Sequence, residues 1–274
     1  MVDERLEVFA KIKGISAASG LVLLRDLLYI ISDNSNYLYQ YNIDIKQLTK
    51  IPLLVTPLLE EIPKSEKSDF ETICQYNNVI YILGSGSTLK RNRLVEYHVE
   101  GKKVVSHDLK PVYTAMKKAH AIGDDDLNIE GAVFTGTKWF LFNRGNGNAH
   151  KNGVFMINGS DLQNAKSADF VLIELPKSNV MPSFTDAVLC DDQIYFVAAA
   201  EDTTSTYNDG EILGSYVGSL DINTLKLNEF KKISDLQKFE GITFLEKKNG
   251  KLGFLICEDA DTESLETVIY KLLI

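Results

Sequence analysis

The chain has 274 residues, with 29 Lys and Arg against 38 Asp and Glu, which gives a formal net charge of −9. With 45% hydrophobic and 24% charged residues, it can bury a large core, so it is neither a disordered chain nor a small disulfide-stapled protein. The acidic balance argues against nucleic acid or an anionic membrane as the main partner, and no apolar run approaches the roughly 18 residues that span a bilayer.

The N-terminal segment, residues 1–15, opens with acidic residues and then alternates apolar with polar residues, as a strand does. A secretory leader would instead show a basic start and an apolar block. We therefore expect a cytoplasmic protein from the sequence as it stands, and a secreted or periplasmic one if a leader has been removed.

Short strands with alternating apolar and polar residues recur along the chain, with turn residues between them. After a first strand at residues 6–12, the predicted strands span residues 27–31, 37–41, 79–83, 94–99, 139–142, 154–157, 194–198, 216–222, 254–256 and 268–272. Residues 111–121 lack the alternation, begin with Pro111 and are rich in helix formers. They predict a short helix, which either decorates the surface or forms a lid over a site.

The three cysteines, Cys74, Cys190 and Cys257, each lie in an apolar segment. No pair of them has the spacing of a metal site. We therefore predict that they are buried and act as small hydrophobic residues.

One short phrase recurs along the chain, in which an acidic residue is followed by a small residue and then by apolar residues that enter a strand. The acidic positions are Glu71, Glu130, Asp186 and Glu240, a first copy has Ser19 in the same position, and successive copies lie 52 to 59 residues apart. Five such units fill the chain. The last unit supplies only three strands, while the strand at residues 6–12 precedes the first unit, as expected when an N-terminal strand closes a ring of blades.

The sequence therefore predicts an all-β fold, with residues 1–274 forming a single domain. The domain is a five-bladed β-propeller with four-stranded antiparallel blades, and the N-terminal strand completes the last blade.

In a propeller the innermost strand of each blade runs along the central channel, so the five positions of the repeated phrase should form a ring at one mouth. Converging carboxylates repel one another, so a bound cation, shared protons or inward-facing basic groups must offset that repulsion. Carboxylates together with a hydroxyl suit Ca²⁺. The predicted metal ligands are Ser19, Glu71, Glu130, Asp186 and Glu240. The alternative is that each acid accepts hydrogen bonds from its own turn and points away from the axis.

The loops that follow the second strand of each blade return to the face that carries the ring. Three of the five Arg residues of the chain fall in these polar loops, namely Arg91, Arg93 and Arg144. A guanidinium is a fixed fork of donors for carboxylate or phosphate, so this bias indicates either an anionic ligand or ion pairs with the ring. Asn143 and Glu201, at the starts of two of these loops, complete the predicted substrate-binding set.

The order Ser, Glu, Glu, a short polar residue and Glu, together with the closing phrase Phe239-Glu240-Gly241-Ile242, resembles the calcium-activated nucleotidases (apyrases). These are five-bladed propellers with a central Ca²⁺ that hydrolyse nucleoside di- and triphosphates. The resemblance implies that Ser19, Glu71, Glu130 and Glu240 are calcium ligands, with Asp186 or Thr185 in the fourth position. The chain is also similar to bacterial propellers grouped with the esterase-like activity of phytase.

Two functions remain open at the level of sequence. In the first, the protein is a metal-dependent hydrolase of a phosphorylated or other anionic small molecule, with Glu71 or Glu130 as the base and the arginines holding the anion. In the second, it is a non-enzymatic module that binds a protein or glycan and uses the cation as a structural pin. We expect a monomer in either case.

Overall fold

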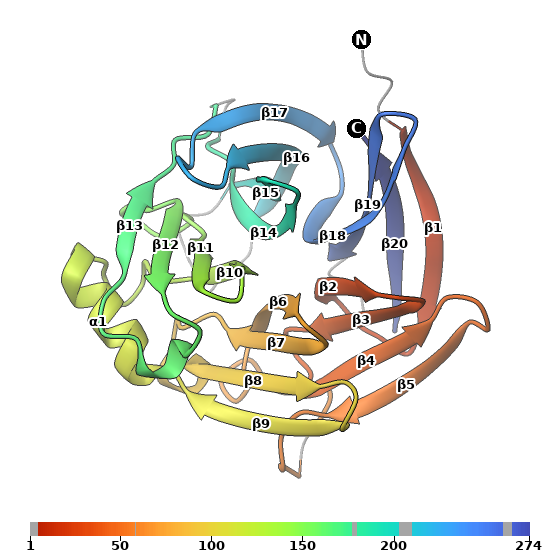
Figure 1. Cartoon of the computed structure of the whole chain (residues 1–274), viewed down its shortest axis with the longest axis horizontal. Helices are drawn as coiled ribbons and strands as arrows, with labels where there is room; N and C mark the ends of the chain where they lie inside the picture. The colour runs from red at the N-terminus through yellow and green to blue at the C-terminus, as the bar shows by residue number, and fades with distance from the viewer. Residues whose placement is uncertain (1–4, 58, 177–179, 203–209, 260–264) are drawn as a thin grey trace.

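The computed structural model describes residues 5–57, 59–176, 180–202, 210–259 and 265–274. Five four-stranded sheets are arranged around a central axis, which confirms the predicted five-bladed propeller (Figure 1). The strand closest to the axis in each blade contacts the corresponding strand of both neighbouring blades, so these inner strands form a closed ring.

Neighbouring strands within every blade are antiparallel. Blade 1 comprises β2 (Ala18–Leu24), β3 (Leu27–Ser32), β4 (Tyr37–Asn42) and β5 (Gln47–Pro52). Blade 2 comprises β6 (Phe70–Tyr76), β7 (Val79–Gly84), β8 (Arg93–His98) and β9 (Lys103–Asp108). Blade 3 comprises β10 (Ile129–Phe134), β11 (Lys138–Asn143), β12 (Gly153–Asn158) and β13 (Asp169–Leu172). Blade 4 comprises β14 (Ser183–Cys190), β15 (Gln193–Asp202), β16 (Glu211–Asp221) and β17 (Leu227–Ser234).

Blade 5 is made from both ends of the chain, as the sequence predicts. Its inner three strands are β18 (Lys238–Lys248), β19 (Lys251–Asp259) and β20 (Glu266–Leu273). The outermost strand is β1 (Arg5–Lys13), which pairs with β20 from Arg5↔Leu273 to Lys13↔Glu266. This pairing closes the ring and covers an edge that β20 would otherwise expose.

The core consists of five apolar clusters, one between each pair of neighbouring blades. Alternation within each strand produces this arrangement, because successive side chains point to opposite faces of a blade and each face packs on a neighbour. Trp139, for example, is fully buried and stacks on Phe134 with 4.1 Å between ring centroids. The three cysteines are free and buried, which confirms their predicted role.

The α-helix of the described residues, α1 (Lys110–His120), matches the predicted helix within one residue at each end. It begins at Lys110 and Pro111, where proline suits the first turn, and ends at Ala121 with φ 50°. Its buried residues Val112, Tyr113 and Met116 belong to the cluster between blades 2 and 3. The helix therefore packs on the outside of the ring of blades rather than over the channel (Figure 1). No helix in the described part of the chain has the length and apolar character of a membrane span.

Two short 3₁₀ helices complete the secondary structure of the described residues. The first, η1 (Leu89–Arg91), lies between β7 and β8, and the second, η2 (Leu162–Asn164), lies between β12 and β13.

Candidate functional site

Each inner strand carries a β-bulge at its first residues. One residue per blade is left out of the register with the second strand, namely Ser19, Glu71, Glu130, Thr185 and Glu240. A bulge re-aims the side chain of the extra residue. Three blades thus present a glutamate at the same mouth of the channel, and two present a hydroxyl.

Hydroxyl groups join neighbouring blades at these bulges. Ser19 Oγ donates to the carbonyl of Phe70 at 2.6 Å, and Thr185 Oγ1 donates to the carbonyl of Phe239 at 2.7 Å. Thr72 Oγ1 makes the equivalent bond to the carbonyl of Ile129 at 3.2 Å. Each accepting residue immediately precedes one of the glutamates, so these inter-blade bonds fix the backbone from which Glu71, Glu130 and Glu240 project.

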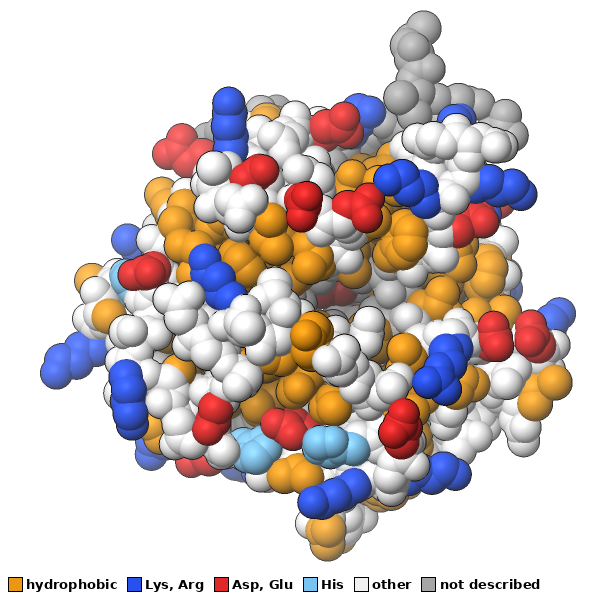
Figure 2. Space-filling view, in the orientation of Figure 1, with side chains coloured by type: hydrophobic (Ala, Val, Ile, Leu, Met, Phe, Trp, Pro, Cys, Tyr) orange, Lys and Arg blue, Asp and Glu red, His pale blue; other side chains and the backbone are white. Residues whose placement is uncertain are grey.

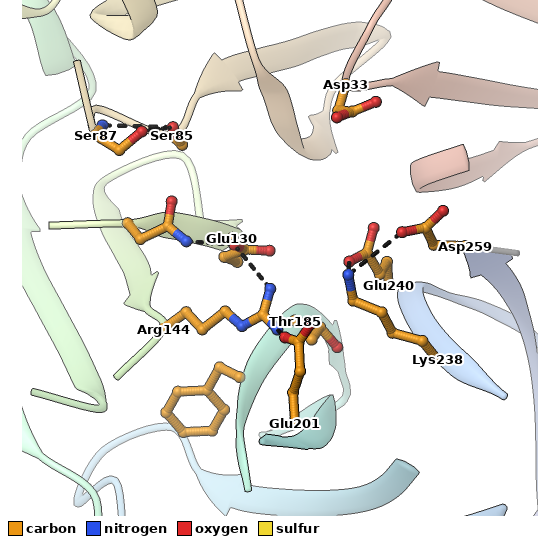
Figure 3. Close-up of polar contacts among 12 residues, drawn as sticks. Asp33, Ser85, Ser87, Glu130, Arg144, Thr185, Glu201, Lys238, Glu240 and Asp259 are labelled. Carbon is orange, nitrogen blue, oxygen red and sulfur yellow. Dashed lines mark hydrogen bonds and ion pairs between the residues drawn. The ribbon is translucent and has the colours of Figure 1, made fainter. Parts of the chain in front are cut away.

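Arg144 links blades 3 and 4 through two carboxylates. Its Nη1 lies 3.3 Å from Glu130 Oε1, and its Nη2 contacts Glu201 Oε2 (Figure 3). Asn128 Nδ2 also donates to Glu130 Oε1, at 2.6 Å. All three charged side chains are almost completely buried. Burial lowers the pKa of Arg144, but Glu130 and Glu201 outweigh it, so the pKa is raised and the guanidinium stays charged.

In blade 5 the ring glutamate pairs with Lys238, the first residue of β18. Its Nζ lies 2.8 Å from Glu240 Oε1 and 3.3 Å from Asp259 Oδ2 (Figure 3). The lysine and both carboxylates are buried. This pair again joins the start of an inner strand to the end of the second strand of its blade.

A third cluster lies at the start of blade 2. Lys67 Nζ contacts Asp33 Oδ2 and lies 2.9 Å from Asp69 Oδ1, and Arg91 Nη1 lies 2.7 Å from Asp69 Oδ2. Burial lowers the pKa of Lys67, but Asp69 and Asp33 raise it further, so the ammonium stays charged. Two of the three loop arginines, Arg91 and Arg144, therefore form ion pairs with carboxylates.

Glu71 differs from the other two ring glutamates. Among the described residues, no group donates a hydrogen bond to its carboxylate and no basic group forms an ion pair with it. Carboxylate oxygens of Glu71, Asp33 and Asp69 all lie within 4.8 Å of one another. Burial, followed by repulsion from Asp69 and Glu130, raises the pKa of Glu71 well above its ordinary value.

The whole mouth carries an excess of acids. Burial also raises the pKa of Glu130, although Arg144 and Lys238 oppose the shift, and it raises the pKa of Glu240 despite Lys238. Four basic side chains of the site, Lys67, Arg91, Arg144 and Lys238, face seven carboxylates, those of Asp33, Asp69, Glu71, Glu130, Glu201, Glu240 and Asp259. The local field therefore favours a cation over an anion.

In blade 4 the ring position is occupied by Thr185, one residue before Asp186, which the sequence pattern predicted there. The bulge falls on Thr185, so Asp186 occupies the position that Gly131 and Gly241 hold in other blades. Asp186 is fully buried, its Oδ2 accepts a bond from the Ile242 N–H at 2.8 Å, and its Oδ1 has no hydrogen-bond partner. Burial raises the pKa of this carboxyl well above its ordinary value.

Two predicted substrate-binding residues lie apart from this carboxylate cluster. Arg93 begins β8 and lines a groove of about 1100 Å³ with residues from blades 1 and 2, where its Nη1 donates to Ser106 Oγ at 3.0 Å. The Asn143 amide donates to the backbone carbonyls of Asp126 and Lys151, so it closes a loop. Parts of two predicted site loops, residues 203–209 and 260–261, lie outside the described residues.

Sequence reasoning missed the partners of the ring glutamates, although a signal for them exists. Asp69, Asn128 and Lys238 each stand two residues before a ring glutamate. Because residues two apart share one face of an extended strand, such a polar residue lies beside the glutamate. Asn128 and Lys238 do contact theirs, and Asp69 lies within the same cluster as Glu71.

The opposite end of the channel has different chemistry. A cavity of about 370 Å³ lies there, lined by the later residues of all five inner strands, including Ile73, Val133, Val188 and Phe244. Hydrophobic side chains surround the channel opening in Figure 2. The cavity lining at this end includes the uncharged polar residues Gln75, Thr135 and Thr243 and no charged side chain, whereas the buried ion pairs described above lie at the mouth where the inner strands begin.

Comparison with known proteins places the chain in a family without assigning a reaction. The chain belongs to a family of unknown function (DUF6929), whose model matches residues 14–274. A search of the curated proteins finds no match.

Solved structures show the same fold at low sequence identity. The glutaminyl cyclase of Myxococcus xanthus has a TM-score of 0.55 at 11% identity, over 98% of this chain and 97% of that one. An exo-1,5-α-L-arabinanase from a bovine ruminal metagenomic library has a TM-score of 0.53 at 10% identity, over 94% and 93%. The PQQ-bound aldose sugar dehydrogenase of Streptomyces coelicolor has a TM-score of 0.52 at 8% identity, over 100% and 99%. These similarities establish the propeller fold alone.

Proposed function

We propose that this propeller binds a divalent cation of the calcium type at the acidic mouth of its channel. The observation that carries the proposal is the carboxylate of Glu71, which has no hydrogen bond or ion pair among the described residues and whose ligand oxygen lies within 4.8 Å of one carboxylate oxygen each of Asp33 and Asp69. Hard oxygen ligands of this kind suit Ca²⁺, which also accepts waters and carbonyls. The resemblance of the ring phrase to the calcium-activated nucleotidases supports the same cation.

Lys67 lies next to two of the proposed cation ligands. Its ammonium contacts both Asp33 and Asp69, so part of the negative charge is already neutralised. The Glu71 carboxylate has no contact with Lys67, so a bound cation would be attracted more strongly to Glu71 than to Asp33 or Asp69. We therefore place Glu71 first among the ligands, with Asp33 and Asp69 beside it and Glu130 and Glu240 across the mouth.

The test is the thermal stability of the purified protein with added CaCl₂ or EDTA. A ligand that binds only the native state raises stability by about 2.7 kcal/mol at a hundredfold excess over its Kd. For a chain of this size we expect an increase in Tm of about 5 °C. Glu71→Gln should abolish the response, and Glu229→Gln, at an exposed residue of β17, should retain it. A wild-type Tm that is the same in CaCl₂ and EDTA would reject the cation site.

The surface around this mouth supports a binding module over a hydrolase. The arginines that would hold an anionic substrate, Arg91 and Arg144, are in buried ion pairs. Large apolar side chains exposed in the loops, including Val55 at 110% of full exposure and Leu89, lie along the groove that holds Arg93 rather than at the mouth. An arginine that is held in a buried ion pair with a carboxylate can bind a substrate anion only at the cost of breaking that pair.

Phosphate release from a panel of nucleotides and phosphoesters, measured with CaCl₂ and with EDTA, separates the two functions. We expect no metal-dependent turnover. Turnover that depends on Ca²⁺ and is lost in Glu130→Gln would instead establish the hydrolase, with Glu71 or Glu130 as its base.

A further inference from the structure

Two histidines flank one glutamate on the outer strands of blade 2, away from the channel. Glu96 and His98 stand two residues apart on β8, and His107 lies on the neighbouring strand β9. Glu96 Oε2 lies 3.2 Å from His98 Nε2, and Glu96 Oε1 lies 3.3 Å from His107 Nε2. Figure 2 shows two His side chains on either side of an acidic side chain at this edge of the propeller.

The contact between His107 Nδ1 and Gln163 determines which nitrogen of the His107 ring carries the hydrogen. His107 Nδ1 lies 2.8 Å from Gln163 Oε1, and an amide oxygen only accepts hydrogen bonds. Nδ1 therefore donates, which leaves the Nε2 lone pair of the neutral ring facing the Glu96 carboxylate. His107 Nε2 is buried and makes no hydrogen bond. A lone pair facing a carboxylate is favourable only when a cation or a proton lies between them.

A small cavity gives this place room for a ligand. It has a volume of about 230 Å³ and is lined by Glu96, His107, Ser160, Asp161 and Gln163, among others. The Gln163 contact corresponds to the outer hydrogen bond that a metal-ligating histidine almost always makes through its second nitrogen. Of the three side chains, Glu96 and His107 line this cavity, and His98 lies outside it.

We propose that Glu96, His98 and His107 bind a transition-metal ion of the zinc type. Two imidazoles and a carboxylate are the protein ligands of several zinc sites that keep a fourth position open. Two ligand atoms at about 2.0–2.1 Å from a tetrahedral ion stand roughly 3.3 Å apart, as the nitrogen and oxygen atoms do here. The two histidines contact different oxygens of Glu96, so His98 must rotate to close the set. Its side chain is 40% exposed and is free to do so.

This site differs from the channel mouth in its ligand chemistry. Imidazole nitrogen suits zinc, copper and nickel, whereas an all-carboxylate set suits calcium and magnesium. The two proposals therefore predict different metals at different residues. Neither depends on the other.

The experiment is a calorimetric titration of the metal-free protein with ZnCl₂, followed by a titration with CoCl₂ read by visible absorption. All variants are made in the Glu71→Gln protein, so that Zn²⁺ binding at the channel mouth contributes as little as possible to the measured heat. We expect one equivalent of Zn²⁺ to bind, and His98→Ala and His107→Ala each to weaken binding at least tenfold. Gln163→Ala, which touches no metal, should weaken it about 10–100-fold.

The matched control is His150→Asn, because His150 lies in another loop and Asn tolerates its φ of 49°. It should leave the affinity for Zn²⁺ unchanged, and thermal melts confirm that each variant is folded. Failure of the protein to bind Zn²⁺, or equal affinity in wild type and His107→Ala, would overturn the proposal. Zn²⁺ binding that is lost only through Glu71→Gln would also overturn it, because the ion would then reside in the channel mouth.

Discussion

Arg144 is the residue whose environment shows most clearly how the channel mouth is built. It contacts Glu130 of blade 3 and Glu201 of blade 4, and its removal leaves two buried carboxylates without their shared counter-charge. Breaking a buried pair in this way costs more than the pair itself contributes.

We therefore predict that Arg144→Met lowers the free energy of unfolding by about 3–5 kcal/mol. Denaturant unfolding followed by circular dichroism measures the change. The triple variant that adds Glu130→Gln and Glu201→Gln should recover part of the loss, because it removes the unpaired charges. Arg25→Met, at an exposed arginine that donates a hydrogen bond to Asn78, should change stability by less than about 0.5 kcal/mol. An Arg144→Met protein as stable as wild type would contradict a role for this pair in holding blades 3 and 4 together.

The raised pKa values of Glu71 and Glu240 have a defined consequence for pH dependence. Burial and neighbouring acids raise both pKa values above the ordinary carboxyl value of 4.5. Between 4.5 and the raised pKa, the unfolded state loses protons that the folded state retains, so folding becomes less favourable. Stability contributed by these protonated groups is therefore fully present below about pH 4.5 and is lost as the pH rises.

In EDTA, we predict that the difference in stability between Glu71→Gln and wild type grows in favour of the variant as the pH rises from 5 to 8, reaching on the order of 1 kcal/mol. Urea unfolding at several pH values measures it. Saturating Ca²⁺ should reverse the sign at pH 8, because the wild type then gains a ligand. A difference that is independent of pH would show that Glu71 does not retain its proton in the folded state.

At the scale of elements, three inner strands carry a glycine directly after the bulge, namely Gly20, Gly131 and Gly241. A Cβ on Gly131 would lie 2.9 Å from the backbone N of Ala187 and 3.0 Å from the Cα of Asp186, both on β14. Backbone atoms cannot move aside as a flexible side chain can. The glycine of the phrase in blade 3 is thus explained by the close approach of the inner strands β10 and β14.

We accordingly expect Gly131→Ala to lower the free energy of unfolding by about 1–3 kcal/mol, through overpacking between β10 and β14. Gly101→Ala is the matched control, because an added Cβ there meets no atom within 4 Å. Thermal or denaturant unfolding compares the two variants. Equal stabilities would mean that the inner strands can separate without cost.

The elements themselves follow from sequence pattern, whereas the blade 4 register does not. Alternating apolar and polar residues, with turn residues between them, locate the strands, because which side chains share one face of a strand depends only on neighbouring residues in the sequence. The bulge in blade 4 falls on Thr185 rather than Asp186 because Thr185 bonds to Phe239 of the next blade. That contact joins residues 54 apart in sequence, so no local pattern reveals it.

At the scale of the whole molecule, closure of the ring depends on β1. This strand pairs with β20 along its length, and the two ends of the chain thereby hold blade 5 together. Without β1, the backbone groups of β20 would form an open edge, which favours association between chains.

Deletion of residues 1–13 should therefore lower stability and produce soluble oligomers or aggregates. Size-exclusion chromatography with light scattering, together with denaturant unfolding, measures both effects. A synthetic peptide of residues 5–13 should restore part of the stability by adding the missing strand. A truncated protein that stays monomeric with unchanged stability would show that ring closure does not need this strand.

By itself the sequence determined the number of blades, the order of their strands, the closure by the N-terminal strand and the mouth at which Glu71, Glu130 and Glu240 meet. These follow from periodicity, because repeated units that bury the same faces must stack in the same way. Only the tertiary structure decided how the charge is balanced. Arg91 and Arg144 neutralise carboxylates, Arg93 lies in a separate groove, and Glu71 forms no ion pair within the part of the chain that the structure describes. Such pairings depend on distances between blades, which no local pattern of residues encodes.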